Sequence, residues 1–232
     1  MKLEGRAVFQ GFSTETIRFL ADLRANNNKE WFEVNRGRYK QHLMEPLQDM
    51  VLALAPCMKS IDLLIETNPK RCISRINRDT RFSKDKSPYR ANMWVSLKRN
   101  YKDWKTEPVF FFELFPDYYR YGMGFYCIPK ETLYEIRGLI DGQDKAFLKA
   151  HSLYKGQGTF SLEGEKYKRI LNPNLPDEWK EWYQRKDIYF VCNKNVDEGL
   201  FRSDLIRELA DGFGTLAPIY HFFLNLRSLG AK

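Results

Sequence analysis

Apolar residues recur at helical spacing through the first quarter of the chain. Ile17, Leu20 and Leu23 follow one another at intervals of three residues and therefore share one face of a helix over residues 13–26. Similar spacing continues downstream, so residues 13–59 are predicted to be helical.

A second helical start lies at Asn27, with Glu30 three residues later as in a capping box. In this helix Trp31, Asn35 and Tyr39 recur every four residues and form a stripe. Two interpretations stay open. Either Trp31 and Tyr39 pack in the core with Asn35 hydrogen-bonded beneath a sheet, or the stripe forms the wall of a site.

The period changes from helical to alternating after residue 70. Alternating or continuous apolar runs predict a sheet core over 71–127, because alternate residues of a strand face the same side. Short links between the runs favour an antiparallel meander. The expected strands are 71–78, 91–98, 108–115 and 118–127.

The remaining chain, 130–228, is predicted to be mixed and mainly helical. Helices are expected at 130–141, 144–154 and 177–184, a hairpin at 158–170, a strand at 188–193, and a helical segment at 203–228 that Gly212, Gly214 and Pro218 break in two. No repeat or linker divides the chain. The predicted fold is one α+β domain, residues 1–232, in which helices from both ends pack on a mainly antiparallel sheet.

The net charge of +8 lies in one short segment. Residues 71–105 hold eleven basic and three acidic side chains, whereas the other residues hold 27 of each. Such a concentration indicates a negatively charged partner for this segment.

Within it, the basic loop 75–90 has the sequence RINRDTRFSKDKSPYR. Arginine and lysine donors suit a carboxylate or phosphate, which predicts an anion-binding loop at one end of the sheet. A salt-bridged structural loop and a protein-interaction loop are the alternatives. The candidate ligand-binding residues are Arg75, Arg78, Arg81, Ser83, Lys86, Tyr89 and Arg90.

Two carboxylates, Asp79 and Asp85, lie among these cations. They are expected to orient basic side chains of the same loop or of the preceding strand, and they are the weak candidates for an acid and a base. Gly122 and Gly124 alternate along a predicted strand. They form either the floor of a ligand site or a position of tight packing against a helix.

Several classes of site are disfavoured by missing motifs. The three histidines lack the spacing of metal ligands, and no phosphate-binding glycine loop or nucleophile elbow occurs, so no metal or cofactor is predicted. The four cysteines form no CxxC pair, and there is no secretory signal or long apolar span. We therefore expect buried thiols, a cytoplasmic setting and no membrane partner. The pattern indicates no oligomeric state.

The loop and its flanking motifs also resemble a known family. The stretches NNNKEWFEVNRGRY (26–39), RINRDTRFSKDKSPYR (75–90) and YGMGFY (121–126) are similar to the family catalogued as domain of unknown function 2461, over most of the chain. Arg90 departs from the pattern, where the family often has lysine. The resemblance implies one intact domain with a motif centred on 75–90, and it implies no substrate. The positions that map onto the family's motifs are Asn27, Trp31, Phe32, Asn35, Arg78, Asp79, Arg81, Phe82, Ser83, Asp85, Lys86, Pro88 and Tyr89.

Three functions follow from these patterns. The leading one is binding of, or an enzymatic action on, a small phosphorylated or carboxylated ligand by the loop 75–90. The second is nucleic-acid binding by the basic aromatic stretch 94–105, where lysine and arginine alternate with Trp94, Tyr101 and Trp104. The third is a non-catalytic interaction protein.

Overall fold

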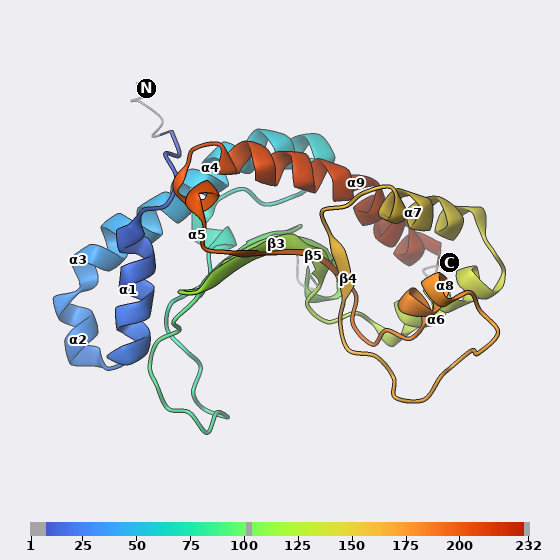
Figure 1. Ribbon diagram of the computed structural model, residues 1–232, viewed down its shortest axis with the longest axis horizontal. Helices are drawn as coiled ribbons and strands as arrows, with labels where there is room; N and C mark the ends of the chain where they lie inside the picture. The colour runs from blue at the N-terminus through green and yellow to red at the C-terminus, as the bar shows by residue number, and fades with distance from the viewer. Residues whose placement is uncertain (1–7, 101–103, 230–232) are drawn as a thin grey trace. The chain divides into compact units, whose positions relative to one another are not determined.

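The computed structural model describes residues 8–100 and 104–229 (Figure 1). A five-stranded antiparallel sheet with the strand order β1-β2-β3-β5-β4 is combined with helices, so the predicted α+β class is confirmed. The strands are β1 (Met93–Leu97), β2 (Pro108–Leu114), β3 (Tyr118–Phe125), β4 (Ser161–Glu163) and β5 (Tyr189–Asn195).

Contacts between residues divide the chain into two compact units. The first combines the described residues before Lys98 with Phe111–Arg120 and Asn193–Ala210. The second holds Tyr121–Cys192 and the described residues near Lys98–Phe110 and after Ala210. The division passes through three strands and the last helix, and the expectation of a single domain stays a prediction.

The helical start of the chain is confirmed. Ser13 caps the first helix, and its side chain and that of Thr16 form a capping box. The second helix is capped by Asn28 and not by Asn27, because the Asn28 side chain accepts the hydrogen bond of the Trp31 amide. The helices of this region are α1 (Thr14–Ala25), α2 (Lys29–Val34), α3 (Arg36–Tyr39), the π-helical turn η1 (Lys40–Met44), α4 (Glu45–Ile61) and α5 (Pro69–Cys72).

The expected strand at 71–78 is wrong in part. Asn68 caps a short helical turn that Pro69 begins, so α5 takes up the first residues. The rest makes only isolated antiparallel bridges, Ile73 with Val95 and Asn77 with Tyr89. The next three strands follow one another in the sheet, as the meander predicts.

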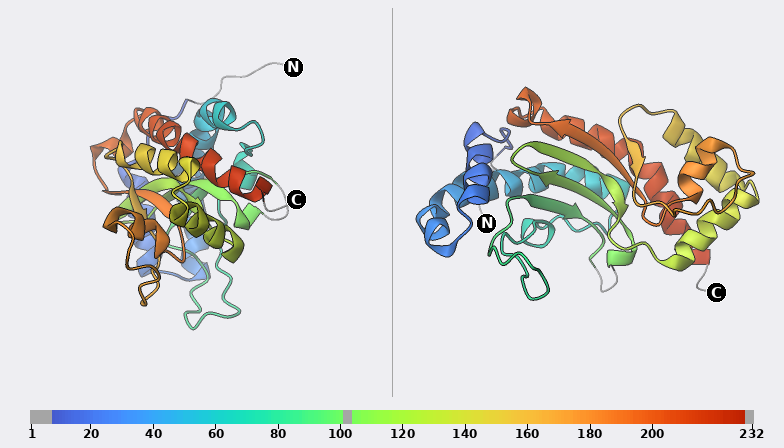
Figure 2. Two further views of the ribbon diagram at one scale, coloured as in Figure 1. Left: turned by 90° about the vertical axis from the view of Figure 1, so that its right-hand side faces the viewer. Right: turned by 60° about the horizontal axis from the view of Figure 1, so that its bottom comes forward.

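The second unit holds α6 (Lys130–Asp141), α7 (Lys145–Lys155) and α8 (Asp177–Tyr183), which cluster together in both views of Figure 2. Their core centres on Trp182, whose ring lies 5.7 Å from Phe147 and 5.3 Å from Phe190. The hairpin expected at 158–170 is wrong, because β4 pairs with β5.

The last helix, α9 (Leu205–Leu229), is continuous, so the predicted break is wrong. Gly212 serves packing: a Cβ atom there would lie 3.0 Å from the rings of Phe160 and Tyr121. A glycine in this helix admits the two rings without ending the helix.

The cysteines are less buried than expected. Cys72 is buried, Cys57 and Cys192 are partly exposed, and Cys127 is exposed just beyond the end of β3. None of the four forms a disulfide. Across 8–100 and 104–229, no helix is long and apolar enough to span a membrane.

Candidate functional site

The basic loop is closed at its base by backbone pairing. The Arg78 amide donates to the Pro88 carbonyl at 2.9 Å, and the Arg90 amide donates to the Ile76 carbonyl at 2.8 Å. Figure 1 shows this blue-green segment as a long loop that projects away from the helices of its unit. The paired base holds the two arms of the loop side by side.

Asn27 fastens this base to the helical region. Its side-chain Nδ2 donates to the Tyr89 carbonyl at 3.0 Å, and its Oδ1 accepts the Tyr89 amide at 3.0 Å. The primary amide thus pairs with both backbone groups of Tyr89, as a neighbouring strand would. Beside it, the Tyr89 ring stacks on Phe32 with centroids 4.1 Å apart. These contacts give Asn27 and Phe32 of the first motif a structural role at the base of the loop.

Both carboxylates of the loop pair with its arginines, as predicted. Asp79 binds Arg81 through an ion pair of 2.7 Å, and Asp85 forms an ion pair with Arg78. Each also closes a turn, because Asp79 Oδ1 accepts the Arg81 amide and Asp85 Oδ1 accepts the amide and hydroxyl of Ser87. The carboxylates therefore shape the loop and orient two of its cations.

These bonds hold both aspartates in the ionised form. The hydrogen bonds from the Arg81 guanidinium and amide lower the pKa of Asp79 to about 2. The Ser87 hydroxyl, followed by Arg78, holds the pKa of Asp85 well below its usual range. Because arginine and serine donors stabilise the ionised form, neither carboxylate carries a proton to donate at neutral pH. Their role is to position the cations of the loop.

Four arginines of the loop region line one open depression of about 580 Å³. Only one carboxylate, that of Asp79, lies among the lining residues, so positive charge predominates. We call this surface the arginine depression. It is lined by Arg75, Asn77, Arg78, Asp79, Thr80, Arg81, Arg90 and Trp94.

Two of these arginines form no ion pair in the part of the chain that the structure describes, although the charge of Arg90 contributes to the lowered pKa of Asp79. Arg75 makes no hydrogen bond or ion pair there. Arg90 lies over the ring of Trp94 at 4.7 Å, and its buried Nε finds no acceptor. Arg78 and Arg81 each form an ion pair with an aspartate, so Arg75 and Arg90 are the two arginines of the depression that form none.

The other candidates of the loop take different positions. Ser83 accepts a hydrogen bond from Arg78 at 3.4 Å, and Lys86 donates to the Thr80 carbonyl at 2.9 Å. Neither lines the depression. Tyr89 lines a second cavity, whereas Trp94, which sequence reasoning assigned to the nucleic-acid alternative, lies in the depression itself.

The four candidates for the wall or floor of a site, Trp31, Asn35, Gly122 and Gly124, line neither cavity. The Trp31 ring packs on Phe19 at 5.8 Å, and Asn35 is held by the Trp31 carbonyl and by Arg38. Gly122 and Gly124 belong to the second unit. There a Cβ atom on Gly122 would lie 1.9 Å from the Phe190 carbonyl oxygen, so the close neighbour is β5, where a helix was expected.

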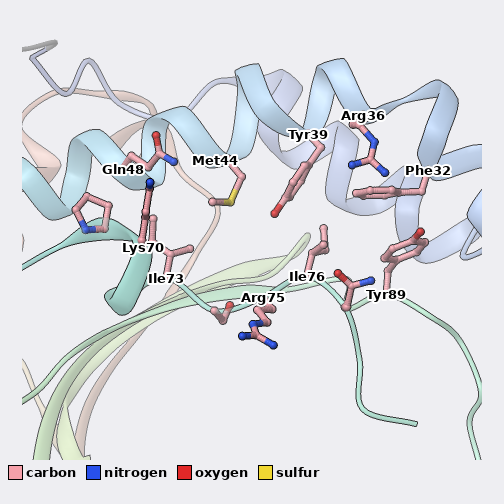
Figure 3. A pocket seen from close by; sticks show the side chains of 13 residues that line it. Phe32, Arg36, Tyr39, Met44, Gln48, Lys70, Ile73, Arg75, Ile76 and Tyr89 are labelled. Carbon is pink, nitrogen blue, oxygen red and sulfur yellow. The ribbon is translucent and has the colours of Figure 1, made fainter. Parts of the chain in front are cut away.

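The second cavity, of about 340 Å³, lies between the helices of the first unit and the segment 73–77 (Figure 3). The sequence named three of its lining residues, Arg75 and Tyr89 as candidate ligand-binding residues and Tyr39 in the helix stripe, but it did not predict the cavity. The helical residues and the segment 73–77 become neighbours only through packing. It is lined by Phe32, Arg36, Tyr39, Met44, Gln48, Pro69, Lys70, Ile73, Ser74, Arg75, Ile76, Asn77 and Tyr89.

Metal ligands do not gather in the described chain. Over residues 8–100 and 104–229, no three His, Cys, Asp or Glu side chains lie together in a way that could hold a metal ion. The groups that line the two cavities are instead mainly cations, amides, hydroxyls and aromatic rings, with the single carboxylate of Asp79.

The fold and the site define an α+β protein with an arginine-lined loop. A family model of conserved hypothetical proteins, domain of unknown function 2461, matches residues 15–222, and the chain belongs to this family. A search of curated proteins finds no match to the chain.

Proposed function

We propose that the protein binds a small phosphorylated or carboxylated ligand in the arginine depression. The observation that carries this proposal is the pair of arginines without an ion pair, Arg75 and Arg90, beside two arginines already held in place by aspartates. A guanidinium can grip a carboxylate or phosphate through two parallel hydrogen bonds. Preorganised neighbours reduce the entropy that such binding costs.

The size of the depression suits a small molecule. About 580 Å³ lies within the range of roughly 300–1,000 Å³ that is typical of ligand pockets. Asp79 and Asp85 accept hydrogen bonds from arginines and have lowered pKa values, so both stay ionised at neutral pH. This favours a role in positioning cations for binding over a role in proton transfer. We also propose a reducing, cytoplasmic setting, in agreement with four cysteines that form no disulfide.

The nucleic-acid alternative is less well supported by the stretch 94–105. Lys98 lies 3.4 Å from the ring centre of Trp104, and Lys105 lies 5.5 Å from that of Tyr126. These cations cover aromatic faces on which a base would stack. Tyr101 and Lys102, which belong to the same alternative, lie outside the described residues.

Titration calorimetry with pyrophosphate tests the proposal. We expect saturable binding that weakens by at least about tenfold in Arg75→Gln and in Arg90→Gln, because a charge-assisted hydrogen bond contributes roughly 1.5–3 kcal/mol. Lys84→Gln is the matched control. This variant loses the same unit charge from the same loop, at an exposed position outside the depression. Its affinity for pyrophosphate should therefore stay within about twofold of that of the unaltered protein.

A duplex DNA probe separates the two functions. Neutralising four phosphates would give a log–log salt slope of about −3.6, whereas a small anion responds far less steeply. Failure of pyrophosphate to bind would refute the proposal. So would steep DNA binding that is lost in Lys98→Gln with Lys105→Gln and retained in Arg75→Gln.

A further inference from the structure

The second cavity is chemically different from the arginine depression. It lies on the helix side of the segment 73–77, and Figure 3 shows Arg75 on the opposite side of that segment from Tyr39 and Met44. No carboxylate belongs to its lining. Arg36, at one edge, is already paired with Glu33 and lies over Phe32. The remaining polar groups decide what the cavity can bind.

Three polar side chains of the cavity have no partner within the described chain. The Tyr39 hydroxyl, the Gln48 amide and the Lys70 ammonium form no hydrogen bond or ion pair with residues 8–100 or 104–229. Burial raises the pKa of Tyr39, so its hydroxyl remains a donor at neutral pH. Tyr39 and Gln48 are partly buried, so their polar atoms favour a partner where water is reduced, whereas Lys70 is exposed and its ammonium is solvated. All three groups are available to a ligand that enters the cavity.

These groups are ordered along the length of the cavity. Figure 3 shows Gln48 and Lys70 beside each other at one end and the stacked rings of Phe32 and Tyr89 at the other. Between them the Tyr39 hydroxyl points into the cavity. The Met44 and Ile76 side chains add apolar surface in the same interval. A polar end with one free cation is thus joined to an apolar, aromatic end.

We propose that this cavity binds a small organic monocarboxylate with an apolar body, separately from the anion in the arginine depression. The carboxylate would lie at the Lys70 and Gln48 end, where one ammonium matches one negative charge and the amide supplies a second donor. The apolar body would extend past Met44 toward Phe32 and displace water from the aromatic end. A volume of about 340 Å³ admits such a ligand, whereas the lack of a free guanidinium fork on this side disfavours a phosphate.

Phenylbutyrate and its neutral amide, phenylbutyramide, are the probes for this site. In titration calorimetry the acid should bind saturably, and the amide should bind at least about tenfold more weakly, because it lacks the charge that Lys70 pairs with. Lys70→Met should weaken the binding of phenylbutyrate by about tenfold or more and leave the binding of phenylbutyramide nearly unchanged. Tyr39→Phe, which removes only the hydroxyl, should weaken the binding of phenylbutyrate about threefold to tenfold.

Two controls separate this site from its surroundings. Arg71→Met removes the neighbouring charge in α5, on a side chain that is 60% exposed and paired with Glu66, and should leave phenylbutyrate affinity unchanged. Arg81→Gln should also leave it unchanged, because Arg81 lines only the arginine depression. Pyrophosphate binding in Lys70→Met should equal that of the unaltered protein, so failure of one site does not imply failure of the other.

Three results would each overturn the inference. The acid and the amide could bind equally well, the acid could show no saturable heat at millimolar concentration, or Lys70→Met and Arg71→Met could have the same effect. Thermal melts of each variant check that the fold is kept. Should Lys70→Met fail to fold, Lys70→Gln takes its place, and unchanged acid affinity in that variant would equally refute the site.

Discussion

The contact between Asn27 and Tyr89 should control how firmly the basic loop is held. In Asn27→Ala, both hydrogen bonds to the Tyr89 backbone are lost, while the caps of α1 and α2, which belong to other residues, stay intact. The loop base then depends on its own backbone pairing. We expect this base to open more often in the variant.

The size of the effect follows from the two bonds. Each partly buried hydrogen bond contributes a net of roughly 0.5–1.5 kcal/mol, so the free energy of local opening should fall by about 1–3 kcal/mol. Opening free energy sets the protection of backbone amides from exchange. Protection at the loop base should therefore decrease by about 5-fold to 150-fold.

Hydrogen exchange measured by NMR reports this directly. The amides of Arg78 and Arg90 are the probes, because both pair across the loop base. Asn92→Ala is the matched control, since the Asn92 side chain makes no hydrogen bond with the described residues and lies in the same segment. The reasoning would be refuted if amide protection changed by less than about twofold in Asn27→Ala, or if it changed equally in Asn92→Ala. Either result would mean that the contact between Asn27 and Tyr89, which we call the clamp, does not hold the loop base.

Three further outcomes are expected, each checked by urea unfolding. Phe32→Ala should cost about 3–5 kcal/mol because Phe32 is only 4% exposed, and Trp31→Ala, which truncates a partly exposed ring, should cost less; equal losses would contradict this. Gly122→Ala should destabilise by at least about 2 kcal/mol because its Cβ would collide with backbone, whereas Gly138→Ala, with open space around it, should stabilise by about 0.5–1 kcal/mol. Burial lowers the pKa of His151, so the unfolded chain takes up a proton at higher pH than the folded protein does, and the free energy of unfolding should fall as the pH drops below about 6.5. His151→Leu should flatten that slope, and an unaltered slope would show that another group causes it.

The sequence alone determined the elements with strong local signals. Helix caps and helical spacing located α1, α4, α6, α7 and α8, and alternation located β1 to β3, because these signals act between residues a few positions apart. The same reasoning located the basic loop and its internal ion pairs. Asp79 and Arg81 are two positions apart, so their contact needs no tertiary structure.

Tertiary structure decided the remainder. The sequence pattern predicts that Gly212 breaks the last helix. In the structure α9 is continuous, and Gly212 leaves room for the rings of Phe160 and Tyr121 to pack against it, which only the folded protein shows. The pairing of β4 with β5 joins segments far apart in the sequence, and no local pattern encodes it. The clamp between Asn27 and Tyr89 is likewise a long-range contact.

The two cavities differ in the same way in how far the sequence predicts them. The arginines of the depression are neighbours in sequence, so the order of residues along the chain is enough to show their concentration of charge. The second cavity depends on Tyr39 and Gln48 from the helical region meeting Lys70 and Ile76 from a later segment. Side chains that meet only through packing leave no periodic signal, because nothing in their spacing records the fold that brings them together.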